Sequence, residues 1–120
     1  MSTTLSGRGL RTVAVKTADY TVVANTDNGM TFTNEGASGA ITFALPAATV
    51  GQWYRFKVKA AQELRIDPNG TETIALPSTG AQQAAGAYLT ANADGEGCEI
   101  ECVKAGVWEV NSYTGTWTAV

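Results

Sequence analysis

The sequence predicts an all-β protein: an antiparallel β-sandwich or a barrel-like, jelly-roll-like fold in a single domain. Short runs of alternating apolar and polar residues recur about every eight to twelve residues, with turn-forming residues between them. Apolar spacing of i, i+3, i+4, i+7 nowhere persists through three helical turns. The 120 residues suffice for one core, and no strict internal repeat indicates a solenoid or a β-helix.

The first ten residues, MSTTLSGRGL, are small and polar and include two glycines. They predict an extended N-terminal arm, residues 1–10, ahead of one domain that spans residues 11–120. The arm lacks the apolar stretch of a secretory signal, so we expect synthesis and folding in a cytoplasm. No run approaches the roughly 18 apolar residues that cross a bilayer, so no membrane association is expected.

Alternation then predicts a series of strands. Val13 and Val15 share one face of the first, and a second strand follows at residues 20–24. The Asn28-Gly29 pair predicts a turn, because glycine takes positive φ without strain, and a third strand follows at residues 30–33. A second turn, at residues 34–39, leads into the most strongly patterned part of the chain.

That part is ITFALPAATVGQWYRFKVK, residues 41–59, which predicts two strands joined by a corner at Pro46. The residues that we expect to face inward are Ile41, Phe43, Leu45, Tyr54, Phe56 and Val58. The residues that we expect to face outward are Trp53, Arg55, Lys57 and Lys59.

The second half of the chain continues the β pattern. Strands are predicted at residues 64–66, 71–76, 87–91, 98–103, 107–111 and 113–120, with turns at residues 67–70, 92–97 and 104–106. Residues 77–86, PSTGAQQAAG, read as an exposed loop, with a single helical turn at residues 81–85 as the alternative.

Two cysteines, Cys98 and Cys102, lie four positions apart in GCEIEC. In a strand both point to the same face as Ile100, and their Cα atoms are about 13 Å apart. A disulfide needs less than about 7 Å, so we expect two reduced thiols in the core.

The composition excludes several classes of function. The chain has no histidine, which removes the commonest general base and metal ligand. Its net charge is −3 and its pI about 4.8, which does not suit a nucleic-acid-binding domain. No nucleophile has a base partner and no phosphate-binding loop is present, so we expect neither an enzyme nor a cofactor site.

Two acidic segments invite a chemical interpretation and do not support one. Residues 92–97, NADGEG, are similar to the first half of a calcium loop, but Val103 stands where the bidentate glutamate belongs, so no metal site is expected. Glu99 and Glu101 share what reads as a solvated strand face, with no sign of the raised pKa that a glycosidase acid requires. Asn69-Gly70-Thr71 matches the glycosylation triplet but is most simply a turn.

A cationic stripe on the outward face is the strongest sign of a partner. It contains Arg55, Lys57 and Lys59, with Arg65 on the next strand, and Trp53 lies beside it. Exposed tryptophan beside arginine is typical of interfaces. An acidic stripe of Glu99, Glu101 and Glu109 is complementary, and the two stripes pair either across neighbouring strands or between subunits. The predicted interface residues are Arg8, Arg11, Trp53, Arg55, Lys57, Lys59 and Trp117.

The chain also resembles a module of structural proteins of tailed bacteriophages, over roughly residues 20–117. The resemblance rests on a Leu-Pro-Ala-Ala corner at residues 45–48 and on a Gly-x-x-Tyr-x-Phe strand formed by Gly51, Tyr54 and Phe56. A turn of the type Ile-x-Pro-x-Gly-x-Glu-x-Ile follows and departs slightly here, as IDPNGTETI at residues 66–74. These matching residues look like determinants of the fold, so the resemblance transfers no contact residue.

Such modules look like capsid decoration proteins and like domains of tail fibres and tailspikes. The resemblance implies a virion protein on the capsid surface, made in the host bacterial cytoplasm. Because no fibre shaft or coiled coil accompanies the module, we expect a decoration protein, most simply a homotrimer bound to the major capsid protein through its arm and outer faces. The alternative is a receptor- or carbohydrate-binding tip of a tail fibre, with the loop at residues 77–86 as its site.

Overall fold

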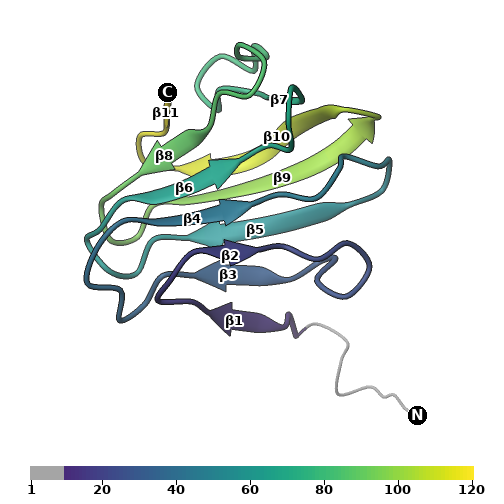
Figure 1. Cartoon of the computed structure of the whole chain (residues 1–120). Helices are drawn as coiled ribbons and strands as arrows, with labels where there is room; N and C mark the ends of the chain where they lie inside the picture. Colours follow the sequence, from purple (N-terminus) through teal and green to yellow (C-terminus); the bar gives the residue numbers. More distant parts are fainter. Residues whose placement is uncertain (1–9) are drawn as a thin grey trace.

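Residues 10–120, which the computed structural model describes, contain eleven strands and no helix (Figure 1). The strands are β1 (Val13–Val15), β2 (Tyr20–Thr21), β3 (Thr31–Thr33), β4 (Ile41–Ala44), β5 (Trp53–Lys57), β6 (Leu64–Asp67), β7 (Thr73–Ile74), β8 (Leu89–Ala91), β9 (Gly97–Lys104), β10 (Val107–Thr114) and β11 (Thr118–Ala119). The all-β prediction is confirmed, and the helical alternative at residues 81–85 is wrong. In this part of the chain no helix could cross a membrane. The predicted arm lies outside the described residues except for the exposed Leu10.

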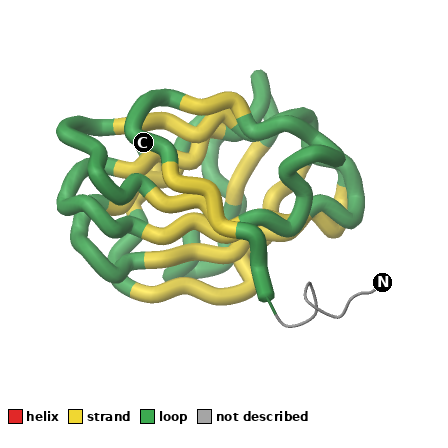
Figure 2. Tube along the Cα trace, turned by 90° about the horizontal axis from the view of Figure 1, so that it is seen from below, coloured by secondary structure: helices red, strands yellow, loops and turns green. Residues whose placement is uncertain are grey.

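The strands form two sheets that enclose one core (Figure 2). The six-stranded sheet has the order β1-β3-β5-β9-β10-β7, and the five-stranded sheet has the order β11-β8-β6-β4-β2. From β1 to β8 the chain alternates between the sheets, so odd-numbered strands lie in one sheet and even-numbered strands in the other. Only the β9–β10 hairpin joins consecutive strands within one sheet.

The strand directions correct the antiparallel prediction. Five pairs are parallel, namely β1–β3, β3–β5, β2–β4, β4–β6 and β7–β10. Four are antiparallel, namely β5–β9, β9–β10, β6–β8 and β8–β11. Parallel neighbours need a long crossover, usually a helix, and here a strand of the opposite sheet supplies it. A half-buried strand alternates in the same way whatever the direction of its neighbour, so the pattern could not show this.

Residues 13–67 therefore wind like a short, two-layered β-helix, although no repeat in the sequence indicates one. The coils differ in length, because the stretch of chain from Val13 to its neighbour Thr31 is shorter than the stretch from Thr31 to its neighbour Arg55. The residues that stack differ as well, since Thr33 lies beside Lys57. Unequal coils with different side chains leave no periodic signal for a repeat search to detect.

Aromatic side chains from both sheets fill the centre of the core. The ring of Phe43 in β4 lies 5.3 Å from those of Phe32 in β3 and Phe56 in β5. Tyr54 lies 5.7 Å from Trp108 of β10, and both are fully buried. Burying such a side chain contributes on the order of 1.5–3 kcal/mol. The predicted inward residues are all buried and thus confirmed: Ile41, Phe43, Leu45, Tyr54, Phe56 and Val58.

The first strand presents its apolar pair to solvent. Val13 and Val15 face solvent, with 57% and 52% of their surfaces exposed, whereas Ala14 packs against the core. The alternation was read correctly, but the apolar pair lies on the outer face. Val13 thereby becomes part of the surface described below.

A buried amide fixes the crossing between the sheets. Asn34, the first residue of the turn predicted at residues 34–39, is fully buried directly after β3. Its Oδ1 accepts hydrogen bonds from the backbone N–H groups of Lys59 and Ala60, at 2.8 and 3.0 Å. Its Nδ2 donates to the carbonyls of Ala60 and Gln62, at 3.2 and 3.3 Å. One side chain thus satisfies four backbone groups in the connection from β5 to β6.

The carboxylate of Glu96 likewise binds several backbone N–H groups, in the segment at residues 92–97 that is similar to half of a calcium loop. Glu96 accepts hydrogen bonds from the backbone N–H groups of Thr116, Ala93 and Asn92, at 2.8, 2.9 and 3.2 Å. It thereby joins the β8–β9 turn to the segment before β11. Burial by itself raises the pKa of Glu96, but these three donors outweigh burial and hold the pKa below its ordinary value of 4.5.

We expect Glu96→Gln to destabilise the protein at pH 7 and to do so less as the medium becomes acidic. Because the pKa of Glu96 is lower in the folded state, its contribution is fully present above pH 4.5 and is lost as the pH falls through the folded value. Urea unfolding of both proteins between pH 7 and pH 3 measures the difference. The exposed Glu35→Gln serves as the control. A difference that stayed constant over this range would show that the charge of Glu96 contributes nothing.

The cysteines lie where the spacing predicts. Cys98 and Cys102 are buried on the inner face of β9 and form no disulfide. Burial, followed by the nearby charge of Glu99, raises the pKa of Cys98 to about 12. A thiol with so high a pKa is almost entirely protonated at neutral pH and is a poor nucleophile. The prediction of reduced core thiols is confirmed.

Candidate interaction surface

The predicted cationic stripe lies on the outer face of the six-stranded sheet. Trp53, Arg55 and Lys57 are half-buried and alternate along β5 with buried residues. Arg55 donates from Nη2 to Oε1 of Glu99 at 2.9 Å, across the β5–β9 pair. Pairing across neighbouring strands is therefore confirmed for these two residues. Glu101, one step along β9, lies beside Trp53 and accepts a hydrogen bond from Asn111 at 2.8 Å instead.

Arg11 reaches this face from the segment just before β1. Its guanidinium carbon lies 4.9 Å from the centre of the Trp53 ring, a cation–π contact. Its Nη1 is also 3.7 Å from Oε1 of Glu99. The single carboxylate of Glu99 thus faces two guanidinium groups, and both arginine side chains remain about two-fifths exposed. Each exposed pair contributes little stability, on the order of 0.2–1 kcal/mol.

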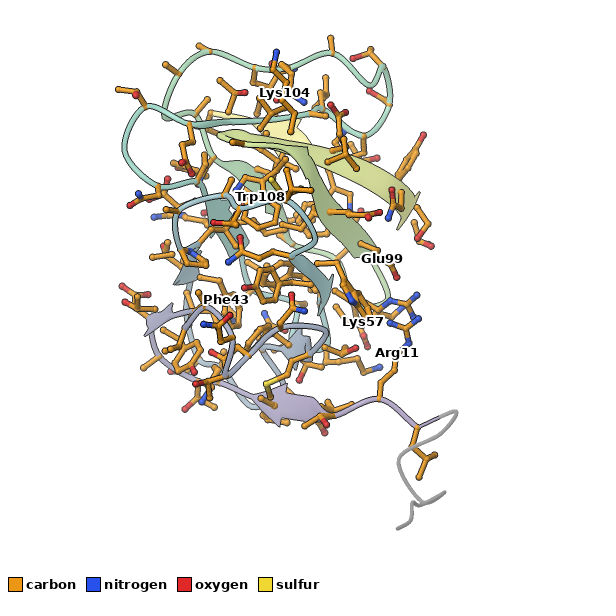
Figure 3. The ribbon with its side chains drawn as sticks, turned by 90° about the vertical axis from the view of Figure 1, so that its right-hand side faces the viewer. Arg11, Phe43, Lys57, Glu99, Lys104 and Trp108 are labelled. Carbon is orange, nitrogen blue, oxygen red and sulfur yellow. The ribbon has the colours of Figure 1, made fainter. Side chains whose placement is uncertain are left out.

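These residues border a groove of about 450 Å³ across β1, β3, β5, β9 and β10, and Figure 3 shows Arg11, Lys57 and Glu99 together on this side of the molecule. Its lining residues are Arg11, Val13, Thr31, Thr33, Arg55, Phe56, Lys57, Gly97, Cys98, Glu99, Ser112, Tyr113 and Thr114. Two cross-strand rows form most of it. One runs Val13, Thr31, Arg55, Glu99, Ser112, and the other runs Thr33, Lys57, Gly97, Thr114.

Lys57 differs from its neighbours in having no acidic partner. The residue beside it on β9 is Gly97, which carries no side chain. The Lys57 side chain extends over this glycine: a Cβ placed at Gly97 would lie 3.2 Å from Lys57 Cδ and 3.6 Å from Nζ. Within residues 10–120 no carboxylate oxygen lies within 4 Å of Lys57 Nζ. The groove therefore contains three cations and one carboxylate, in a protein whose net charge is −3.

Two basic residues of the predicted set lie away from the groove. Lys59, past the end of β5, pairs with Asp94 at 3.2 Å. Arg65 lies on β6 of the five-stranded sheet, where its Nε donates to Glu63 at 3.0 Å. Its inclusion in the stripe is wrong, because the next strand along the chain belongs to the opposite sheet. Arg8 lies outside the described residues.

Trp117 corrects another prediction. It was expected on an outer face, but only 4% of its surface is exposed. Its indole Nε1 donates to the carbonyls of Gly97 and Thr114, at 3.0 and 3.3 Å. A buried indole needs such acceptors, and the spacing of residues 113–120 gave no sign of them. Trp117 is a structural residue that closes the end of β10 and takes no part in the surface.

Sequence reasoning missed several parts of the groove. Tyr113, of which 47% is exposed, lines it because β10 continues to Thr114, three residues beyond the predicted end. Gly97 was assigned to a turn and is the first residue of β9. Pairing of β5 with β9 creates the groove, and nothing in the sequence of either strand indicates which partner it takes.

The chemistry that this surface offers is binding by charge and hydrogen bonds. Arginine and lysine side chains provide donors without acceptor capacity, while Ser112 and Thr114 provide hydroxyl groups. Within the part of the chain that is described, no group of three or more His, Cys, Asp or Glu residues is arranged to hold a metal ion.

No model of a known protein family matches the sequence, and no curated protein matches it at a significant level.

Proposed function

We propose that this chain is a bacteriophage capsid decoration protein that binds the outside of the shell and stabilises it. The observation that carries the proposal is the position of Arg11. It is the point at which the N-terminal segment joins the domain, and it lies at the groove beside Trp53 and Glu99. The N-terminal segment and the charged outer face therefore start from one side of the molecule, so both can contact one shell surface. The bacteriophage resemblance of residues 45–74 supports the same function.

The proposed mechanism is mechanical and involves no catalysis. The protein bridges neighbouring copies of the major capsid protein and resists the outward pressure of packaged DNA. As a homotrimer it would present three modest contact sites together, and the second and third contacts form at high effective concentration. The two sheets, packed as a β-sandwich, would serve as a rigid support for such contacts.

Removal of residues 1–10 should leave the fold intact and weaken attachment to the shell. We expect at least about a tenfold loss of affinity for undecorated capsids of the encoding phage, since losing one contact of a multivalent set lowers avidity by a large factor. Co-sedimentation with capsids measures the affinity, and thermal unfolding checks the fold. If the full chain failed to sediment with capsids, the decoration function would be wrong. Saturation by the truncated chain at unchanged affinity would refute the role of the arm alone.

The alternative, a receptor- or carbohydrate-binding tip of a tail fibre, draws support from Tyr113. Tyr113 is exposed and lines the groove, as do Ser112 and Thr114, which carry hydroxyl groups. Such a surface suits a sugar ring as well as a peptide. Retention of the protein on host cells, without binding to capsids, would favour this function over decoration.

A further inference from the structure

Arg55 and Lys57 occupy equivalent positions in the two rows of the groove, and only one of them is neutralised. Both point outward from β5 and face β9, two residues apart. The residue opposite Arg55 is Glu99, whose carboxylate lies 2.9 Å from the guanidinium. The residue opposite Lys57 is Gly97. Both positions on β5 thus carry a cation, but only the one at Arg55 has an acidic residue opposite it on β9.

The missing side chain lets Lys57 lie across β9 and leaves its charge without a partner. Gly97 has no Cβ, and the Lys57 side chain lies across it toward the groove. Thr33 on one side and Thr114 beyond Gly97 continue the row, and neither carries a charge. A carboxylate that entered here would meet Lys57 as Glu99 meets Arg55. Glu99 itself shows that this sheet face holds a carboxylate between neighbouring cations.

We propose that the groove receives an extended acidic polypeptide segment of the partner, with one carboxylate at Lys57 and others at the exposed guanidinium groups of Arg11 and Arg55. This inference rests on the proposed function, because it names the kind of segment that the capsid surface would present. It does not involve the N-terminal segment. It predicts which chemistry the shell must supply opposite this face.

Charge complementarity argues for an acidic occupant. The groove contains three cations and one carboxylate, while the whole chain carries −3, so an anionic segment is attracted to this groove and repelled by the remaining surface. A neutral glycan would gain nothing from the unpaired ammonium group. Single-stranded nucleic acid binds through rows of stacking aromatic rings, and Tyr113 is the one exposed aromatic side chain among the lining residues. The exposed Val13 at the rim suits an apolar side chain of a peptide.

The test compares two charge reversals in the full chain. Lys57→Glu alters the groove, whereas Lys104→Glu makes the same change at an exposed residue at the far end of β9, well separated from Arg11 and Glu99 in Figure 3. The probe is a fluorescein-labelled octaglutamate peptide, and fluorescence anisotropy reports its binding. We expect Lys57→Glu to weaken binding at least about tenfold and Lys104→Glu to change it less than about twofold, because charge effects fall off over a Debye length.

Two further measurements keep the result interpretable. Lys57→Gln, which removes one charge without adding another, should weaken binding by an intermediate factor, and circular dichroism with thermal unfolding shows whether each variant folds. An oligothymidylate of equal charge serves as the competing probe. The inference is overturned if the peptide does not bind, if Lys104→Glu weakens binding as much as Lys57→Glu, or if the oligonucleotide binds more tightly than the peptide.

Capsid co-sedimentation of the same proteins separates this inference from the proposed function. Wild-type protein and Lys57→Glu that bind capsids equally well would leave decoration standing and refute the groove as the contact. Wild-type protein that binds the peptide through Lys57 but ignores capsids would keep the acidic-segment site and refute decoration. Loss of capsid binding in Lys57→Glu alone supports both.

Discussion

Replacing Asn34 with alanine is expected to lower the free energy of unfolding by about 3 kcal/mol or more. Its buried side chain satisfies two N–H groups and two carbonyls in the connection between β5 and β6. Each backbone group left without a partner away from water costs about 1–3 kcal/mol. Alanine leaves three of the four unpaired, since the carbonyl of Ala60 also accepts a hydrogen bond from the N–H of Gln62. Urea unfolding at pH 7 measures the change.

Two variants sharpen the result for Asn34. Asn34→Asp retains an acceptor for the N–H groups of Lys59 and Ala60. Its carboxylate has no donor for the carbonyls of Ala60 and Gln62, and it places a negative charge beside these two oxygens. Asn28→Ala is the matched control, because its amide makes one hydrogen bond to the backbone of Trp53 at an exposed site. A loss for Asn34→Ala no greater than that for Asn28→Ala would mean that water replaces the amide, contrary to this account.

Replacing Trp108 with alanine is expected to cost about 3–5 kcal/mol, in the range for large aromatic residues removed from a core. Trp108 is fully buried, and its ring lies 5.7 Å from that of Tyr54. Its strand, β10, joins β9 to β7. The cavity would therefore open where antiparallel and parallel pairing meet, and thermal unfolding together with urea unfolding measures the loss.

The indole nitrogen of Trp108 provides an internal control. Among the described residues Nε1 is buried and has no hydrogen-bond partner, so Trp108→Phe removes an unsatisfied donor as well as volume. We expect Trp108→Phe to cost much less than Trp108→Ala. Trp53→Ala, at a half-buried surface position, should also cost much less. Similar losses in Trp108→Ala and Trp53→Ala would contradict a core centred on Trp108.

Much of the core followed from the sequence because burial leaves a direct mark on alternation. Each strand has one face toward solvent and one toward the core, so its residues alternate between the two. On this basis Tyr54, Phe56 and Val58 were assigned inward and Arg55 and Lys57 outward. The same reasoning placed Cys98 and Cys102 inside. Alternation alone therefore predicts part of the candidate surface, namely the outward residues of β5, without any knowledge of which strands pair.

The rest of the surface depends on which strands are neighbours, and alternation does not specify neighbours. Gly97 matters only because β9 lies beside β5, and Tyr113 only because β10 lies beside β9. Arg65 was joined to the wrong group because consecutive strands belong to opposite sheets. Asn34 looked like a turn residue, since its type favours turns and its four partners lie more than twenty positions further along the chain.

The coil of the first six strands also constrains the order in which the protein can assemble. β1 and β2 have no strand to pair with until β3 and β4 have been synthesised. β5 can pair with β3 at once, but it gains its second neighbour only when β9 has been synthesised. Pairing strands that are far apart in the chain costs loop-closure entropy, and few contacts that form early offset this cost. We therefore expect slow folding for so small a chain. Most of the polypeptide must leave the ribosome before its six-stranded sheet can close.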